Sequence, residues 1–391
     1  MEACQICKSN DWKALPDPNP NKCVTTAGRI LEQPLGKSQC NHCGFVQRVR
    51  VQFLGFSDFY EQDYANYYER PGAEKFHFNR YKVMIEWMNQ FVMNGDKLKT
   101  ALDVGCGQGW AMKVFSEMHP NVSIEGVEPS HYNVSRARAK GLTIHEGKLE
   151  DLGLKEKHYD IIFSNNVIQH VNNAEDFLNG LKTLLKDDGV IVITCPDGSL
   201  PNIEILWGDQ NFSFLPQHLI ALAGRMGFKY TFWTPSVANP ALPPAQLFVL
   251  SNNESYSSLK TDTSNKNTNL NIQEVFEKRS NYLNTFPKLN KEICEKIGDE
   301  KNVYNLGASY WSSVLAAYCP DYWAKVNKLV LDEPSDISEF LNKKIVMSKD
   351  IAKEDKGALV LGIAPASQTN VKERLQGDWK KVITWNDKVA Y

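Results

Sequence analysis

The sequence lacks long apolar runs: no stretch approaches the roughly 18 consecutive apolar residues that a membrane-spanning helix needs. The first segment, MEACQICKSNDW, also lacks the apolar core of a secretion signal, so we expect a cytoplasmic protein. There is no large excess of charge either, because 44 lysines and arginines stand against 46 aspartates and glutamates, a formal net charge of −2. This balance gives no electrostatic basis for binding nucleic acid or an anionic membrane.

What is present is the composition of a globular protein. The 391 residues are 42% hydrophobic and 23% charged, which suits two or three folded domains. Nine cysteines without a secretion signal favour thiols or a metal site over disulfides.

Four of the cysteines form two CxxC pairs, Cys4-x-x-Cys7 and Cys40-x-x-Cys43. Each pair can supply two thiolates from one tight turn to a tetrahedral Zn²⁺. A single CxxC would also fit a redox motif, but two pairs predict structural zinc in an amino-terminal module over residues 1–55. The alternative is a loop with free thiols. Zinc would stabilise a module that has little apolar core of its own.

A glycine-rich turn follows an apolar run in ALDVGCGQGW, residues 101–110. The run suits a buried parallel strand, and Gly105, Gly107 and Gly109 permit positive φ and close approach of the backbone to a ligand. The next predicted strand ends at Glu128, where a carboxylate can accept both hydroxyls of a ribose. The two features together predict a nucleotide-like ligand at the edge of a parallel sheet.

This pattern resembles motif I and the following acidic motif of class I S-adenosylmethionine (SAM) methyltransferases. The E/DxGxGxG text of that family starts here at Asp103. The dinucleotide fingerprint GxGxxG is not matched, because Trp110 stands three positions after Gly107, so SAM is favoured over NAD. The resemblance and the sheet-edge position imply a set of cofactor contacts: Asp103, Gly105, Gly107, Gly109, Glu128 and Asn165.

Predicted strands and helices alternate over residues 96–250, which indicates a parallel sheet covered on both faces. An aromatic-rich helical connector is expected before it, over residues 56–95, and a polar linker after it, over residues 251–271. Residues 272–391 contain a second glycine turn and further strands, which predict another Rossmann-like unit. That unit either binds a nucleotide or is purely structural, and one glycine does not decide between the two.

The order of the modules resembles the zinc-containing sugar C-methyltransferases, which act on nucleotide-linked keto-deoxysugars. The likeness lies in CxxC…CxxCG, LDVGCGQG and NLGAS and spans nearly the whole chain. It implies zinc bound structurally and SAM bound centrally. It also implies a small sugar-like or nucleotide-linked substrate held between the central and outer domains.

One motif departs from that family. In that family the motif EHxxYF helps to deprotonate the carbon beside a ketone. In this sequence Asp209 followed by Gln210 stands at the position of the acid and the histidine. The amide of Gln210 cannot act as the base. The candidate catalytic groups are therefore Asp209, Tyr64 and His77, with His218 as a further substitute. His170 takes the place of a histidine that is frequent in the family, and packing near the sheet edge is its simplest interpretation. Carbon, oxygen and nitrogen acceptors all stay open.

Three classes of function are compatible with these observations. The favoured one is a SAM-dependent methyltransferase acting on a small molecule. An NAD-dependent oxidoreductase is disfavoured by the missing GxGxxG spacing. A zinc-ribbon interaction protein with a relic SAM domain is the third, and it predicts no SAM affinity.

Overall fold

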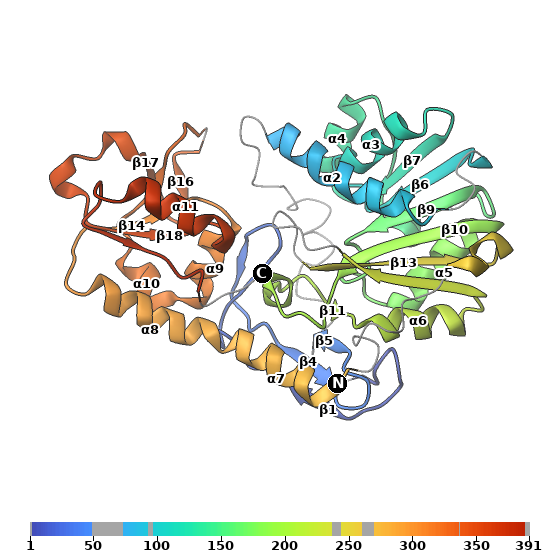
Figure 1. The fold of residues 1–391 in the computed structure, drawn as a ribbon, viewed down its shortest axis with the longest axis horizontal. Helices are drawn as coiled ribbons and strands as arrows, with labels where there is room; N and C mark the ends of the chain where they lie inside the picture. Colours follow the sequence, from blue (N-terminus) through green and yellow to red (C-terminus); the bar gives the residue numbers. More distant parts are fainter. Residues whose placement is uncertain are drawn as a thin grey trace.

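The protein forms two α/β lobes with a small β module between and beneath them, in a computed structural model that describes residues 2–48, 73–92, 97–236, 244–259, 270–335 and 337–387 (Figure 1). Half of the predicted aromatic connector, including Tyr64, lies outside these ranges. No helix within them is both long and apolar enough to cross a bilayer.

The central lobe is a seven-stranded sheet in the order β12-β13-β10-β9-β6-β7-β8. The five strands from β6 to β10 are parallel, whereas β13 runs antiparallel to both β10 and β12. The strand bounds are β6 Thr100–Val104, β7 Ser123–Glu128, β8 Thr143–Glu146, β9 Tyr159–Asn165, β10 Leu185–Pro196, β12 Tyr230–Pro235 and β13 Ala245–Ser251. The strand order reverses between β6 and β9, and ligands of such sheets bind at the carboxyl ends of those strands.

The helices of this lobe are amphipathic segments that cover the sheet. They are α2 Ala73–Asn89, α3 Trp110–Met118, α4 His131–Ala139, α5 Ala174–Leu184 and α6 Pro216–Arg225. α5 shows how the sequence sets one of them: the Asn173 side chain caps its start, and Phe177, Leu178 and Leu181 are buried against the sheet. The predicted Rossmann-like α/β fold of this domain is confirmed.

The amino-terminal module borrows a strand from the central lobe. Its four-stranded sheet has the order β1-β4-β5-β11, and β11 lies some 160 residues beyond the module in the sequence. The bounds are β1 Trp12–Ala14, β4 Lys37–Cys40, β5 Val46–Arg48 and β11 Phe212–Ser213, with a separate hairpin of β2 Cys23–Val24 and β3 Ile30–Leu31. The module therefore does not complete its sheet with its own residues.

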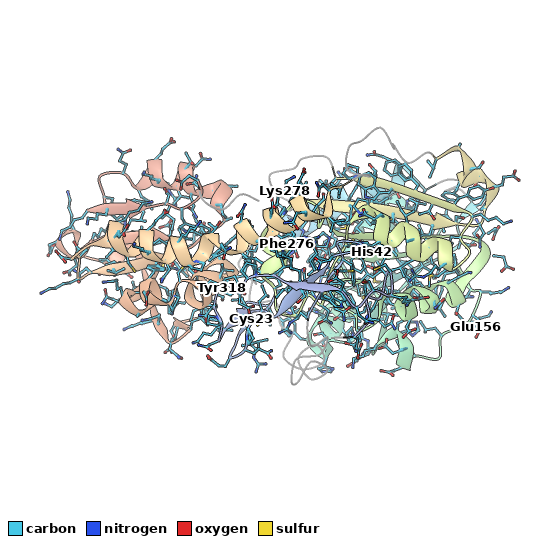
Figure 2. The ribbon with its side chains drawn as sticks, turned by 90° about the horizontal axis from the view of Figure 1, so that it is seen from below. Cys23, His42, Glu156, Phe276, Lys278 and Tyr318 are labelled. Carbon is cyan, nitrogen blue, oxygen red and sulfur yellow. The ribbon has the colours of Figure 1, made fainter. Side chains whose placement is uncertain are left out.

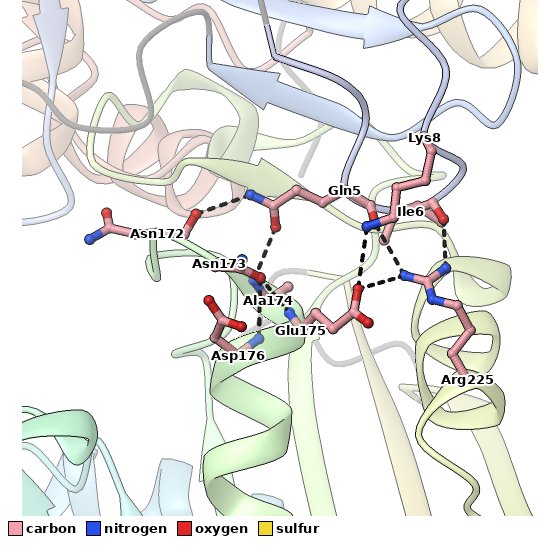
Figure 3. Close-up of polar contacts among 9 residues, drawn as sticks. All are labelled: Gln5, Ile6, Lys8, Asn172, Asn173, Ala174, Glu175, Asp176 and Arg225. Carbon is pink, nitrogen blue, oxygen red and sulfur yellow. Dashed lines mark hydrogen bonds and ion pairs between the residues drawn. The ribbon is translucent and has the colours of Figure 1, made fainter.

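The first CxxC loop is docked onto α5 and α6 of the central lobe (Figure 3). The Gln5 side chain accepts a hydrogen bond from the backbone of Ala174 at 3.1 Å and donates one to the carbonyl of Asn172 at 3.0 Å. Arg225 donates to the carbonyl of Ile6 at 2.6 Å and to Glu175 at 3.0 Å. These contacts fix the first CxxC loop to the central lobe through backbone groups of both segments.

The carboxyl-terminal lobe has a six-stranded sheet in the order β16-β17-β15-β14-β18-β19. Five strands are parallel and β16 pairs antiparallel at one edge. The strand bounds are β14 Val303–Leu306, β15 Lys328–Leu331, β16 Glu339–Phe340, β17 Lys343–Met347, β18 Ala358–Leu361 and β19 Lys381–Ile383. The helices are α7 Ile272–Leu283, α8 Thr285–Ile297, α9 Tyr310–Tyr318, α10 Pro320–Lys325 and α11 Pro365–Leu375.

Two buried side chains join the three parts. The Tyr318 hydroxyl, from α9, donates to the carbonyl of Leu206 at 2.7 Å and accepts from the amide of Val24 at 3.4 Å. Figure 2 shows Tyr318 beside Cys23 at this junction. Arg279, on α7, is fully buried and donates to the carbonyls of Gly198 and Gly44 at 2.8 and 2.7 Å. Both contacts link segments that are far apart in the sequence.

Lys37 is a buried cation in the amino-terminal sheet. Only 2% of its surface is exposed, and its Nζ donates to the carbonyl of Ile205 at 2.9 Å. Burial and, to a smaller extent, the charge of Arg48 lower the pKa of Lys37 from 10.5 to about 7, and Asp209 opposes the shift. The folded state therefore holds this lysine neutral above pH 7, whereas the unfolded chain keeps it protonated up to about pH 10.5.

We predict that Lys37 makes the protein more stable as the pH rises from 7 to 9. The unfolded state binds more protons in this range, so the free energy of unfolding rises by up to about 1.4 kcal/mol per pH unit. Lys37→Met should remove this component, as measured by urea unfolding at pH 7, 8 and 9. Lys344→Met, at an exposed position of β17, is the matched control. An equal pH slope in the wild type and Lys37→Met would contradict the prediction.

Candidate functional site

The glycine turn lies at the carboxyl end of β6, where the sheet order reverses. Gly105, Gly107 and Gly109 all have positive φ, at 76°, 54° and 77°. A Cβ on Gly105 would lie 2.2 Å from Val167, and one on Gly109 would lie 2.2 Å from Leu142, so both positions require glycine. A Cβ on Gly107 would meet no atom of the described residues within 4 Å. Side chains therefore pack against the turn at Gly105 and Gly109, whereas the described residues leave space at Gly107.

Glu128 ends β7 beside this turn, with its carboxylate held by three donors. One oxygen accepts from the amide of Gly107 at 2.9 Å; the other accepts from the amide of Ser130 at 3.1 Å and the Asn133 side chain at 3.3 Å. Burial raises the pKa of Glu128, and these three donors oppose the shift. The carboxylate is thus oriented before any ligand binds.

Asp103 and Asn165 add buried polar atoms without partners at the same edge. Asp103, in β6, is 1% exposed, and neither carboxylate oxygen has a hydrogen-bond partner among the described residues. Burial raises the pKa of Asp103 well above its usual value, and the charge of Glu128 raises it further. Asn165 accepts from Thr194 at 3.1 Å, while its amide nitrogen is buried without a described partner. Unpaired buried polar groups are costly, and a ligand with donors and acceptors would satisfy them.

Aromatic side chains surround the turn. Trp110 begins α3, and the ring of His77, from α2, stacks on it at 6.4 Å between centroids. The indole nitrogen of Trp110 is a further buried atom without a partner in the described structure. Burial raises the pKa of Tyr81, also on α2, and the charges of Asp103 and Glu128 raise it further. The sequence analysis did not predict a role for Tyr81. This residue lies in a predicted helix well before the glycine motif and belongs to no motif of its own.

Asp209 lies in a different setting from the one its motif suggests. It is fully buried, and its carboxylate accepts from both the amide of Thr26, at 2.8 Å, and the Thr26 hydroxyl. His170 donates from Nδ1 to the carbonyl of Asp209 at 3.0 Å and lies 3.7 Å from its carboxylate. Gln210 donates to Glu204. The acid at this position is thus surrounded by protein groups from two modules.

His218 is excluded as a substitute base. It is fully buried in α6, its Nδ1 accepts from the amide of Leu215 at 2.9 Å, and its Nε2 donates to the carbonyl of Cys43 at 2.8 Å. Burial lowers the pKa of His218 to about 3. Both ring nitrogens are occupied, so this histidine is structural.

The four predicted metal ligands come together. The sulfur atoms of Cys4, Cys7, Cys40 and Cys43 all lie within 4.8 Å of one another. The Cys4–Cys43 and Cys7–Cys40 sulfur distances are 3.6 and 3.5 Å, which is too long for disulfides and close to the roughly 3.8 Å edge of a tetrahedron with 2.3 Å metal–sulfur bonds. This donor set can hold one tetrahedral metal ion.

The second glycine turn, in the carboxyl-terminal lobe, is filled by the chain itself. Gly307 has a φ of 104°, and a Cβ there would lie 2.9 Å from the carbonyl of Gly362. The Asn305 side chain donates to the carbonyl of Gly307 at 2.8 Å and to the Ser312 hydroxyl at 3.0 Å. A nucleotide would therefore have to bind outside this turn, and such binding stays a prediction.

Comparison with known proteins identifies the central lobe. Residues 76–231 match the family described as methyltransferase domain. Malonyl-[acyl-carrier protein] O-methyltransferase of Bacillus cereus is 31% identical over 97 residues, which is 24% of this chain and 36% of that protein. A ubiquinone biosynthesis O-methyltransferase of Rhodopseudomonas palustris is 28% identical over 98 residues, or 24% and 38% of the two chains. The chain thus spans little more than a third of the length of these curated relatives.

A SAM-dependent methyltransferase from Thermotoga maritima has 19% sequence identity and a TM-score of 0.41, covering 50% of this chain and 99% of that one.

The family match gives a methyltransferase domain over residues 76–231, and the glycine turn and Glu128 lie within it. The prediction of this domain from the sequence is confirmed. The predicted cofactor contacts Asp103, Gly105, Gly107, Glu128 and Asn165 lie at one sheet edge, and Gly109 is the N-cap residue of α3 beside them.

We predict that Glu128→Ala weakens binding of S-adenosylhomocysteine at least about tenfold, since it removes an oriented, charged hydrogen-bond acceptor. Glu146→Ala is the matched control, because Glu146 is the neighbour of Glu128 on the next strand and is partly exposed. Titration calorimetry measures both. Unchanged affinity of a folded Glu128→Ala variant would remove the proposed contact.

Proposed function

We propose that the protein transfers a methyl group from SAM to a small-molecule acceptor. The observation that carries this proposal is the glycine turn at Gly107 beside the oriented Glu128 carboxylate, at the same sheet edge as the buried Asp103 carboxyl, whose oxygens have no partner among the described residues. The family match over residues 76–231 supports it.

The residues present fit the cofactor. Glu128 would receive the ribose hydroxyls, and the open backbone at Gly107 would allow close approach of the ligand. Asp103 and Asn165 would pair their buried atoms with donors and acceptors of the ligand. Bound SAM supplies an activated methyl group, so the protein's work is to align the acceptor with it and to exclude water.

We further propose a sugar-like or nucleotide-linked acceptor. The order of modules and the motifs CxxC…CxxCG, LDVGCGQG and NLGAS support this class. The structure places a lobe on each side of the amino-terminal module, with α7 and α8 along one side (Figure 1). A substrate with two chemically different halves would fit contacts from both lobes.

An oxygen or nitrogen acceptor is the second candidate. Gln210 donates its amide to Glu204 and offers no base where the sugar C-methyltransferase motif has histidine. The relatives named above are O-methyltransferases, which supports the same alternative.

Methyl transfer can be tested with radiolabelled SAM and a panel of nucleotide-linked keto sugars, hydroxy compounds and amines. We expect label to enter one class of acceptor, and Glu128→Ala to lower kcat/KM for SAM at least about tenfold. Binding of NADH to the same protein is measured as well, because it tests the alternative of an NAD-dependent oxidoreductase. Absence of SAM affinity and of transfer to every class would contradict the proposed function and favour an interaction protein.

We also propose that Cys4, Cys7, Cys40 and Cys43 hold one structural Zn²⁺. Closed structural zinc sites commonly use cysteine thiolates as ligands. Four thiolates complete the tetrahedral coordination and leave no position open for catalysis. The site lies at the docked CxxC loop of Figure 3, so the metal would fix the surface that binds α5 and α6.

Metal analysis of the purified protein should give about one zinc per chain. Cys40→Ser should lower the zinc content and the thermal midpoint, because metal binding contributes to folding. Cys294→Ser, at a partly buried cysteine outside the cluster, is the control. The assignment would be contradicted if the purified wild-type protein contained no zinc and Cys40→Ser had the same thermal midpoint as the wild type.

A further inference from the structure

We propose that the carboxylate of Glu204 receives the proton that the acceptor releases during methyl transfer, and that Gln210 and Arg80 are positioning residues for this carboxylate. The proposal rests on the proposed function and deepens it. It also gives a role to the amide that stands where the resembled motif has histidine, because Gln210 holds an acid that lies six positions upstream.

Glu204 lies in the segment that follows β10 at the carboxyl edge of the central sheet. It belongs to a short 3₁₀ helix, Ile203–Leu206, which is capped by Asn202: the Asn202 side chain accepts from the amide of Glu204 at 2.9 Å. β10 pairs with β9, the strand that ends at Asn165, so the segment starts at the sheet edge where the predicted cofactor contacts lie. The cap fixes the backbone that carries the carboxylate away from this edge.

The same short helix contacts the carboxyl-terminal lobe. Trp207, which ends it, packs edge to face on Tyr310 with 5.7 Å between ring centroids, and Tyr310 is the first residue of α9. The carbonyl of Leu206 accepts from Tyr318, which is also on α9. Because α9 follows β14, it starts at the carboxyl edge of the second sheet. Glu204 is therefore on a segment between the carboxyl edges of both lobes, where a substrate with two different halves would lie.

One face of α2 connects Glu204 to the glycine turn. His77, Arg80, Tyr81 and Met84 share this face, because helix positions three, four and seven apart lie on one side. His77 stacks on the indole ring that begins α3, and the sulfur of Met84 accepts a hydrogen bond from a threonine at the end of β10 at 3.7 Å. Burial and the two carboxyl groups at the glycine turn raise the pKa of Tyr81. Arg80 thus faces the same edge, and its charge acts on Glu204.

The carboxylate of Glu204 is held at one oxygen. Its Oε2 accepts from Nε2 of Gln210, a residue that is 3% exposed. Glu204 itself is half-buried, and no hydrogen bond to its Oε1 is present within the described ranges. Asp209 differs in both respects, because it is fully buried and both its oxygens accept from Thr26. Of the two acids in this segment, Glu204 is the one with an oxygen that a substrate can reach.

The groups around Glu204 suit it to accept a proton. Burial raises the pKa of Glu204, and the hydrogen bond from Gln210 and the charge of Arg80 oppose that shift. The charge of Asp209 adds to the rise in pKa, and that of Lys37 opposes it. The net result is a pKa above the ordinary 4.5 of a glutamate. A carboxylate with a raised pKa is a stronger base than an ordinary one, and its pKa is closer to the working pH.

The proposed step is balanced. The acceptor atom, which is carbon, oxygen or nitrogen, forms a bond to the methyl carbon, and the methyl–sulfur bond breaks with its electron pair left on sulfur. The electron pair of the acceptor's bond to hydrogen stays on the acceptor, and the proton passes to Oε1 of Glu204. The neutral carboxyl group then loses this proton to solvent, which restores the carboxylate for the next turnover.

Carbon-13 nuclear magnetic resonance of the full chain, labelled at the glutamate carboxyl carbons, tests the positioning without any acceptor or SAM. The resonance that is missing from Glu204→Gln identifies this residue. We expect its pKa above 4.5. Gln210→Met and Arg80→Gln should each raise it further, because a hydrogen bond and a positive charge favour the ionised form, and Arg80→Lys should stay closer to the wild type. A pKa at or below the ordinary value, or one that either Gln210→Met or Arg80→Gln leaves unchanged, would overturn the proposal.

Kinetics with the acceptor class identified by the radiolabel assay test the chemistry. Glu204→Gln should lower kcat about a hundredfold or more, with little change in affinity for S-adenosylhomocysteine. Glu204→Ala should regain part of kcat when formate is added, since this small carboxylate can replace the missing base, and a purely structural role would not give this recovery. Gln210→Met should move the acid limb of the kcat profile to higher pH. Glu254→Gln is the matched control, because Glu254 is an exposed glutamate of another short 3₁₀ helix.

The outcomes separate the two proposals. Retention of kcat within about threefold by Glu204→Gln would overturn the role of Glu204 while the methyltransferase function stands. A loss in Glu204→Gln that appears only in KM for the acceptor would show a binding role and would also overturn the proton transfer. A wild type without SAM affinity would overturn the proposed function and, with it, the role of Glu204.

Discussion

The arrangement of the three parts depends on one buried cation, Arg279. Its guanidinium donates to the carbonyl of Gly198 in the central lobe, to the carbonyl of Gly44 beside the cysteine cluster, and to the Gln39 side chain at 2.7 Å. Burial lowers the pKa of Arg279 to about 9, and the nearby Asp197 opposes the shift. A buried charge is tolerated only when its donors are paired, so α7, the amino-terminal sheet and the end of β10 must keep their relative positions. Apolar packing alone would allow these surfaces to slide.

The same constraint connects the modules to the cofactor edge. The amino-terminal sheet is completed by β11, and the next residues upstream, from Trp207 to Asn211, carry Asp209 and Gln210. The hairpin turn of that module reaches Asp209 through Thr26. Thr26 thus connects the amino-terminal module to Asp209, whose backbone carbonyl accepts a hydrogen bond from His170.

Much of the central fold could be predicted because its signals are local. The apolar run before Gly105 and the acid at Glu128 are separated by one helix, and a parallel sheet brings the ends of neighbouring strands together. The two CxxC pairs are likewise local, and tetrahedral coordination explains why both should converge. The contacts of Thr26 and His218 could not be predicted, since each depends on which surfaces of separate modules meet. The spacing of motifs along one sequence does not show which surfaces of separate modules dock against each other.

The sequence by itself determined the glycine–acid motif, the cysteine ligands and the alternation of strands and helices, because each follows from backbone geometry or donor chemistry over short stretches. Tertiary structure decided the setting of Asp209. The motif alone presents it as an acid near the reaction, but packing buries it between Thr26 and His170. The physical reason is that the environment of an ionisable group depends on every element packed around it, and these elements are distant in the sequence: Thr26 is 183 positions from Asp209 and His170 is 39.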